Sequence, residues 1–207
     1  MKYITDGENN KHNTKSGDDI ATRTLYTLAK RRDRRNYFSA SLIFLCVIFF
    51  LSITVGCLLY IYLKQTEALP VFDIQAPPDT FTEAVKTVLK NYFISFLPFA
   101  LVFVLGFTTI CSLLNGLLCA FLGVFAGFFI TYMYKLSAVG YLSASLSLAL
   151  YCFVFLYFSA VSVSFSHSLS PNGEFDSLFE EDLACYLRYL LTSASATLAA
   201  CIIYHII

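Results

Sequence analysis

Charged side chains are scarce in this chain of 207 residues. Only 14% of the residues are Asp, Glu, Lys or Arg, whereas soluble domains carry about 25%. Residues 91–166 contain a single charged side chain, Lys135, in an otherwise largely apolar stretch. No soluble domain can bury so long a run, so the composition places the chain in a lipid bilayer. Acidic and basic residues are equal in number, which leaves no overall positive field to attract nucleic acid.

Patterns that carry chemistry are also missing from the sequence. The seven cysteines form no CxxC pair and have no histidine beside them at ligand spacing, so we expect buried thiols and no zinc site or disulfide framework. There is no HExxH, GxSxG or P-loop motif. His12, His167 and His205 lie far apart along the chain. The sequence therefore predicts no enzyme, no metal and no cofactor.

The basic residues that are present gather at the N-terminus. Nine of the fourteen Lys and Arg precede Leu42. Residues 1–36 are polar and have little apolar surface to bury, which predicts a disordered tail. Because basic clusters next to a membrane helix stay cytoplasmic and attract anionic lipid, we expect the N-terminus inside the cell. The topology signal is the cluster of Lys30, Arg31, Arg32, Arg34 and Arg35.

Apolar segments of about 20 residues, the length that crosses a bilayer, follow this tail. They predict an all-α, multi-pass protein of the cell membrane, in which residues 37–207 form one domain with an extracytoplasmic C-terminus. The turn between the second and third spans, around Ser112–Gly116, carries no charge and can be re-entrant. We expect a cytoplasmic loop over residues 166–186. The five predicted spans are 42–63, 92–113, 114–134, 139–165 and 187–207.

A short amphipathic helix is predicted on the outer side, before the second span. Thr80 and Glu83 have the spacing of a capping box, and apolar residues recur on one helical face behind them. Such a helix lies in the membrane interface. It either caps the bundle or offers an extracytoplasmic partner a contact surface. The apolar residues of that surface are Phe81, Val85, Val88 and Leu89.

Small residues on one side of the third span predict close helix packing. Gly116, Ala120, Gly123 and Gly127 lie on roughly one face, and small residues let helix backbones approach closely in lipid. Two roles are open for this face, packing within the chain and dimerisation, and the sequence favours the former. The fourth span is rich in serine, and we expect these hydroxyls to bond within their own helix or across to a neighbour.

Residues 81–166 resemble the stage II sporulation protein M family of endospore-forming bacteria. The resemblance includes Asn91-Tyr-Phe93, Val104-Leu-Gly106, Gly127-Phe128 and a glycine, Gly140, ahead of a serine-rich span. The chain departs from the family at Cys111-Ser-Leu113, where members commonly have Gly-x-Pro.

The resemblance implies a non-catalytic membrane scaffold. Its implied partners are two peptidoglycan hydrolases, a lytic transglycosylase and an amidase/endopeptidase, and its implied process is the thinning of septal wall for engulfment during endospore formation. The residues alone leave a small-solute permease or a transporter membrane subunit as an alternative. That alternative predicts a polar cavity near Ser112–Gly116.

Overall fold

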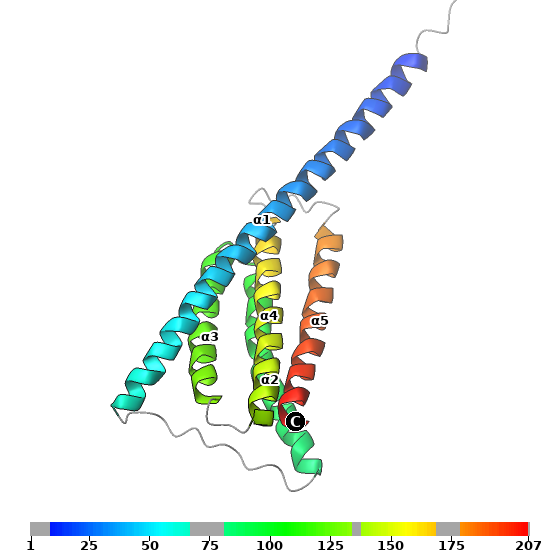
Figure 1. The fold of residues 1–207 in the computed structure, drawn as a ribbon. Coiled ribbons are helices and arrows are strands. Elements are labelled where there is room, and N and C mark those ends of the chain that lie inside the picture. The colour runs from blue at the N-terminus through cyan, green and yellow to red at the C-terminus, as the bar shows by residue number, and fades with distance from the viewer. Residues whose placement is uncertain (1–8, 67–80, 134–137, 169–178, 207) are drawn as a thin grey trace, which may run out of the picture. The chain divides into compact units, whose positions relative to one another are not determined.

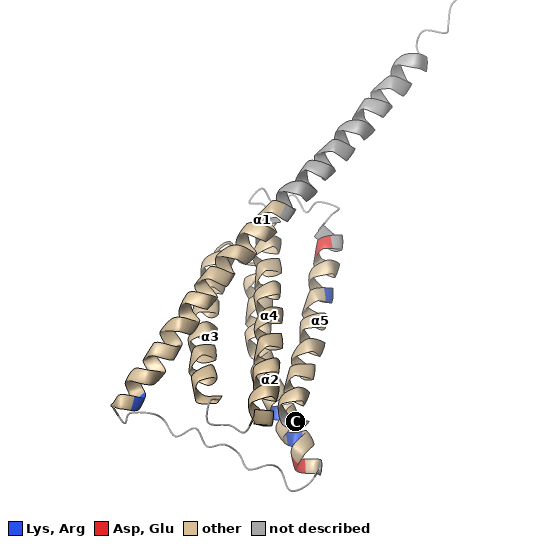
Figure 2. Ribbon diagram, viewed as in Figure 1, with Lys and Arg blue, Asp and Glu red and all other residues tan. Residues whose placement is uncertain are grey.

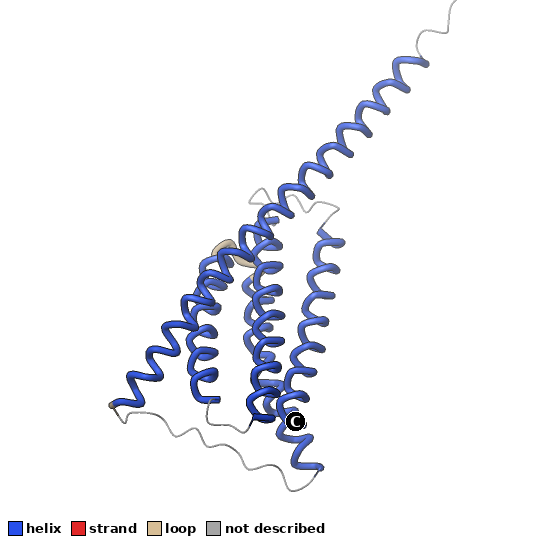
Figure 3. The backbone as a smooth tube through the Cα atoms, in the orientation of Figure 1, coloured by secondary structure: helices blue, strands red, loops and turns tan. Residues whose placement is uncertain are grey.

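The computed structural model describes residues 9–66, 81–133, 138–168 and 179–206, and all regular secondary structure in these ranges is helical. Side chains are described for 36–66, 82–133, 138–167 and 182–204. Figure 3 shows helices joined by one short described connection, between α2 and α3. The helices, labelled in Figure 1, are α1 (Asn9–Gln65), α2 (Phe81–Leu105), α3 (Cys111–Met133), α4 (Ala138–Ser168) and α5 (Phe179–Ile206).

Each of these helices contains a stretch long and apolar enough to cross a membrane. The five stretches of the described chain are Asn36–Gln65, Thr82–Leu105, Cys111–Met133, Ala138–His167 and Asp182–Tyr204. Charged residues of the described chain lie towards helix ends (Figure 2), where they avoid the cost of burial in hydrocarbon. The expected fold, an all-α multi-pass membrane protein, is confirmed. Lys135, expected in a turn, lies outside the described residues.

The bundle is organised around α4, which contacts α3 on one side and α5 on another. Helix α2 contacts α3, α4 and α5. The buried core is rich in aromatic rings, and Phe99 of α2 packs edge-on against Tyr151 and Phe155 of α4 with centroid distances of 5.5 Å in both pairs. The wide apolar surfaces that remain exposed, such as Phe93 and Leu97 of α2, are the surfaces that lipid covers in a membrane.

The N-terminal tail differs from the sequence prediction of disorder, because α1 already begins at Asn9. Helix propagation adds one hydrogen bond for each residue fixed, so a helix nucleated in the apolar stretch can extend into a polar one. The chain divides between Tyr37 and Phe38 into two units, so the single helix α1 belongs to both. The predicted topology cluster, Lys30 to Arg35, falls within α1, but its side chains lie outside the described residues.

The predicted boundaries of the second and third spans were wrong. The expected interfacial helix and the second span are one continuous helix, α2, and the turn lies at residues 106–110 and not at Ser112–Gly116. Helix α2 ends because its last turn tightens: the Gly106 amide donates to both Val102 and Phe103 carbonyls. The Thr108 hydroxyl then bonds the Leu105 carbonyl at 2.7 Å, and such back-bonding competes with helix continuation.

The predicted loop over residues 166–186 was also too long. Helix α4 continues to Ser168 and α5 begins at Phe179, which places Tyr186 inside a helix and buries it to 1% exposure. The acidic residues around position 181 lowered the apparent hydrophobicity of this segment. The aromatic packing of Tyr186 places this first part of α5 in the core, and the sequence alone does not show that packing.

Candidate functional site

The predicted small-residue face of α3 lies against α1. A methyl group added at Gly123 would lie 2.7 Å from the Phe49 carbonyl oxygen and 2.7 Å from Cβ of Ser52. Neither neighbour is the flexible end of a long side chain, so even one carbon has no room. Gly123 thus lets the two helix backbones meet, as small residues do in membrane bundles.

Gly127 continues this close contact between α3 and α1 one turn further along α3. A methyl group there would collide with the Ile53 carbonyl oxygen and lie 3.1 Å from Cα of Gly56. The Cys57 thiol donates to the Gly127 carbonyl at 3.4 Å. We did not single out Gly56 from the sequence, although Ser52 and Gly56 repeat the four-residue spacing of small residues that marks close contacts.

The other two predicted packing residues have looser surroundings. Gly116 is buried, but a methyl group there would meet only the ends of the Ile48 and Phe44 side chains, at ordinary contact distances of 3.5 Å and 3.8 Å. Ala120 is half-buried. The closest contact between α3 and α1 of the same chain therefore comprises Gly123 and Gly127, with Gly56 opposite. We call this contact the seam.

The start of α2 presents the predicted contact surface. Val85 is 41% exposed and Leu89 is 47% exposed, while Val88 is half-buried. The side chain of Phe81 lies outside the described residues. Two exposed apolar side chains one turn apart thus precede the more apolar part of the span. Exposed charged residues, Glu83, Lys86 and Lys90, share this part of the helix.

A buried polar cluster that sequence reasoning missed ties α2 to α4 and α5 beside the 106–110 turn. The Ser162 hydroxyl donates to the Val102 carbonyl at 2.8 Å, and the Tyr186 hydroxyl donates to the same carbonyl at 3.1 Å. The Tyr186 ring stacks on Phe165 with centroids 4.5 Å apart. Gly106 makes room for it, since a methyl group there would collide with the Tyr186 hydroxyl.

Asn115 and its neighbours occupy the place where the permease alternative predicted a polar cavity. Asn115 is fully buried, and its amide nitrogen donates to the Cys111 sulfur at 3.1 Å. Cys111 in turn lies 3.4 Å from the Ser162 hydroxyl. Two buried oxygens here have no hydrogen-bond partner, Oδ1 of Asn115 and Oγ of Ser159. Packed side chains therefore surround Asn115.

This cluster has little capacity for acid–base chemistry. The hydrogen bonds described above join hydroxyl, thiol, amide and carbonyl groups, none of which serves readily as a general base near neutral pH. The seven cysteines are free thiols. Among the described residues, no three His, Cys, Asp or Glu side chains gather closely enough to hold a metal ion.

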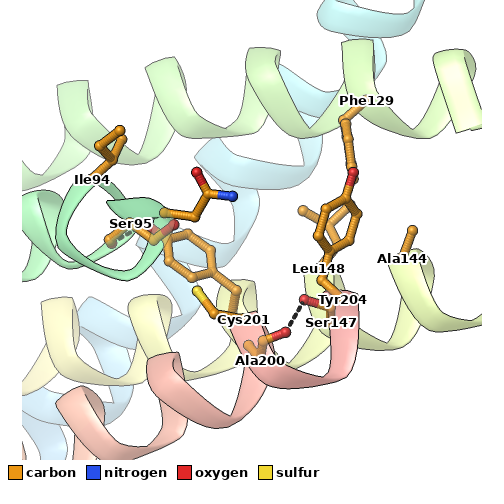
Figure 4. Close-up of a pocket in the computed structure, with 11 residues that line it drawn as sticks. Ile94, Ser95, Phe129, Ala144, Ser147, Leu148, Ala200, Cys201 and Tyr204 are labelled. Atoms are coloured by element: carbon orange, nitrogen blue, oxygen red, sulfur yellow. Dashed lines mark hydrogen bonds between the residues drawn. The ribbon is translucent and has the colours of Figure 1, made fainter. Parts of the chain in front are cut away.

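A cavity of about 340 Å³ lies at the opposite end of the bundle, where α2 begins and α5 ends. Figure 4 shows Ser95 of α2, Ser147 of α4 and Tyr204 of α5 around it. Its volume falls in the range of about 300–1,000 Å³ that is typical of small-molecule sites. The sequence alone could not predict this cavity, because four helices contribute one or a few lining residues each. The other lining residues are Asn91, Ile94, Phe129, Ala144, Leu148, Tyr151, Ala200 and Cys201.

Comparison with protein-family models, with curated proteins and with solved structures finds no match to this chain.

Proposed function

We propose that this multi-pass membrane protein is a non-catalytic scaffold that holds peptidoglycan hydrolases at the bacterial cell membrane. The observation that carries the proposal is the exposed apolar surface at the start of α2, formed by Val85 and Leu89 at the end of a membrane span. The class of partner follows from the sequence resemblance to the stage II sporulation protein M family. The process that this resemblance implies is septal wall thinning during engulfment.

The proposal requires that the start of α2 faces the cell wall. A cytoplasmic N-terminus, expected from the basic cluster ahead of the first span, places the end of α1 and the start of α2 on the outer side after one crossing. A hydrolase that acts on the wall works on that side. The seam between α1 and α3 supports a scaffold role, because the glycine contacts hold these two helices in direct contact.

Val85→Asp tests the contact surface. A carboxylate in the middle of an apolar contact loses its hydration without gaining a partner, so recovery of the hydrolases should fall. The tagged full-length chain is crosslinked in sporulating and in growing cells of its source, and the captured proteins are assayed for peptidoglycan hydrolysis. We expect hydrolase activity in the sporulating sample only, and its loss with Val85→Asp.

Thr87→Asp is the matched control. It adds the same charge at a half-buried position on the side of the helix that carries Glu83 and Lys90, and should leave hydrolase recovery intact. Membrane insertion and the amount of protein are measured for both variants. Equal recovery with Val85→Asp and the unaltered chain would remove this surface from the proposal, and an absence of hydrolase from both samples would remove the scaffold role.

A further inference from the structure

Two of the hydroxyl groups that line the cavity, on Ser147 and Tyr151, already donate their own protons. The Ser147 hydroxyl donates to the Ala200 carbonyl of α5 at 2.8 Å, and the Tyr151 hydroxyl donates to the Ser95 carbonyl of α2 at 2.9 Å. A hydroxyl group has one proton and two lone pairs. Both oxygens can therefore still accept a hydrogen bond from a molecule in the cavity.

Pro98 leaves a further backbone carbonyl without its usual donor beside the cavity. It lies within α2 and has no N–H, so the Ile94 carbonyl four residues earlier lacks its helical donor. Three other lining residues, Asn91, Ser95 and Tyr204, carry hydrogen-bond donors. The lining therefore contains both donors and acceptors, and a ligand hydroxyl, which can donate and accept, fits it.

The lining residues also indicate which charge a ligand can carry. None of them is Lys, Arg, Asp, Glu or His. A phosphate or an ammonium group would lose hydration here without a counter-charge, which is costly in a membrane. The chemistry fits a neutral group that carries hydroxyls.

A second, almost wholly apolar hollow of about 220 Å³ adjoins the first. The two share Phe129, Leu148 and Tyr151. The second continues towards the middle of the bundle, where Ala126 of α3 and Phe155 of α4 line it. From Ala144 in the first hollow to Phe155 in the second is eleven residues of α4, about 16 Å along a helix and about half of the hydrocarbon thickness.

We propose that these two hollows form a binding site for a neutral lipid of the acylglycerol class. Its glycerol hydroxyls form hydrogen bonds with Ser147 and Tyr151 in the first hollow, and its acyl chain follows the apolar hollow between α3 and α4. The head therefore lies nearer the start of α4 than the acyl chain does. The site does not depend on the scaffold role.

The probe for this site is a photoreactive monoacylglycerol with a diazirine in its acyl chain, added to the full-length protein purified in detergent. After irradiation, we expect crosslinks in the peptides that contain Ala126 and Phe155. Unlabelled monoacylglycerol should compete. A fatty-acid methyl ester of the same chain has no hydroxyl, and the matching lysophosphatidic acid carries a charge. Both should compete at least about fivefold more weakly.

Two variants that fill the hollows test the same assignment. Ser95→Leu fills the polar end and Ala126→Leu fills the apolar hollow, and each should lower crosslinking by roughly tenfold, as expected for a blocked site. Their matched controls are Ser195→Leu on α5 and Ala149→Leu on α4, exposed positions that line neither hollow. The controls should crosslink like the unaltered protein.

Size-exclusion profiles and thermal unfolding show which variants fold, and the competition series uses the unaltered chain and so does not depend on them. Crosslinks spread evenly over the exposed apolar surfaces would mean ordinary bilayer contact and overturn the proposal. Equal competition by the methyl ester or by lysophosphatidic acid would overturn it as well, because no recognition of a neutral hydroxylated head would remain.

Discussion

At the scale of single residues, the glycines of α3 differ in what an added methyl group would meet. At Gly127 it would meet backbone atoms of α1, and at Gly116 only the side-chain ends of Ile48 and Phe44. We predict that Gly127→Ala destabilises the bundle by about 1–3 kcal/mol, the cost of overpacking a close contact. The free energy of unfolding, measured in mixed micelles, checks this.

Gly116→Ala is the control for the same chemical change in the same helix. Alanine is favoured over glycine in a helix interior by about 1 kcal/mol, and the site at Gly116 has room for it. This variant should be as stable as the unaltered chain or slightly more stable. Equal losses from both substitutions would show that the seam is not what makes Gly127 necessary.

The glycine spacing could be recognised from the sequence because it repeats at four-residue intervals on one helical face. Its partner could not, because Gly56 is a single glycine more than sixty residues away along the chain. The same holds for Tyr186, whose environment depends on rings from α2 and α4. A local pattern shows which face of a helix is special, and only the folded bundle shows what covers it.

At the scale of the helices, the serines of α4 divide into two groups by where their hydroxyls bond. Ser145 bonds the Leu142 carbonyl of its own helix, whereas Ser147 bonds the Ala200 carbonyl of α5. We predict that Ser147→Ala lowers the free energy of unfolding by about 0.6 kcal/mol, and by no more than about 1.7, the range for hydrogen bonds between membrane helices.

Ser145→Ala should have almost no effect on stability, because its bond within α4 links no second helix. Both variants are compared by equilibrium unfolding in bicelles under one set of conditions. A loss with Ser145→Ala as large as that with Ser147→Ala would contradict the assignment of Ser147 as the tie between α4 and α5. The sequence left both kinds of bond open, and the structure contains both.

Helix boundaries were the least predictable feature at this scale. Hydrophobicity changes little between Leu105 and Cys111, so nothing in composition separates α2 from α3. The turn is set by a local hydrogen bond from Thr108 to Leu105 and by Gly106, whose contact with Tyr186 appears only when the helices are packed. The number and type of helices, in contrast, follow directly from apolar segments long enough to cross a bilayer.

At the scale of the whole molecule, the five candidate spans of the described chain predict that the two ends lie on opposite sides of the membrane. We predict that alkaline phosphatase fused after Ile207 is active in bacteria, and that the same enzyme fused before Met1 is inactive, since it matures only outside the cytoplasm. We expect the basic cluster ahead of the first span to set this direction. Green fluorescent protein at the same two positions should give the reverse pattern.

Replacing Arg31, Arg32, Arg34 and Arg35 with Gln tests the cause of this orientation. We expect a mixed or inverted population of fusions, because these residues hold much of the basic charge next to the first span. Activity of the phosphatase at both ends of the unaltered chain would contradict an odd number of crossings. Fusions that keep their orientation without the arginines would assign the signal to other residues.

The two unpartnered oxygens, on Asn115 and Ser159, have a thermodynamic consequence for the bundle. Both side chains are fully buried, one on α3 and one on α4, and the Cys119 thiol, a weak hydrogen-bonding group, lies beside Ser159. Each unsatisfied oxygen costs about 1–3 kcal/mol. Hydration would return that free energy, so water gains by entering the junction of α3 with α4. We therefore expect thermal unfolding to start at the junction of α3 with α4, before the contact between α1 and α3 at the glycines is lost.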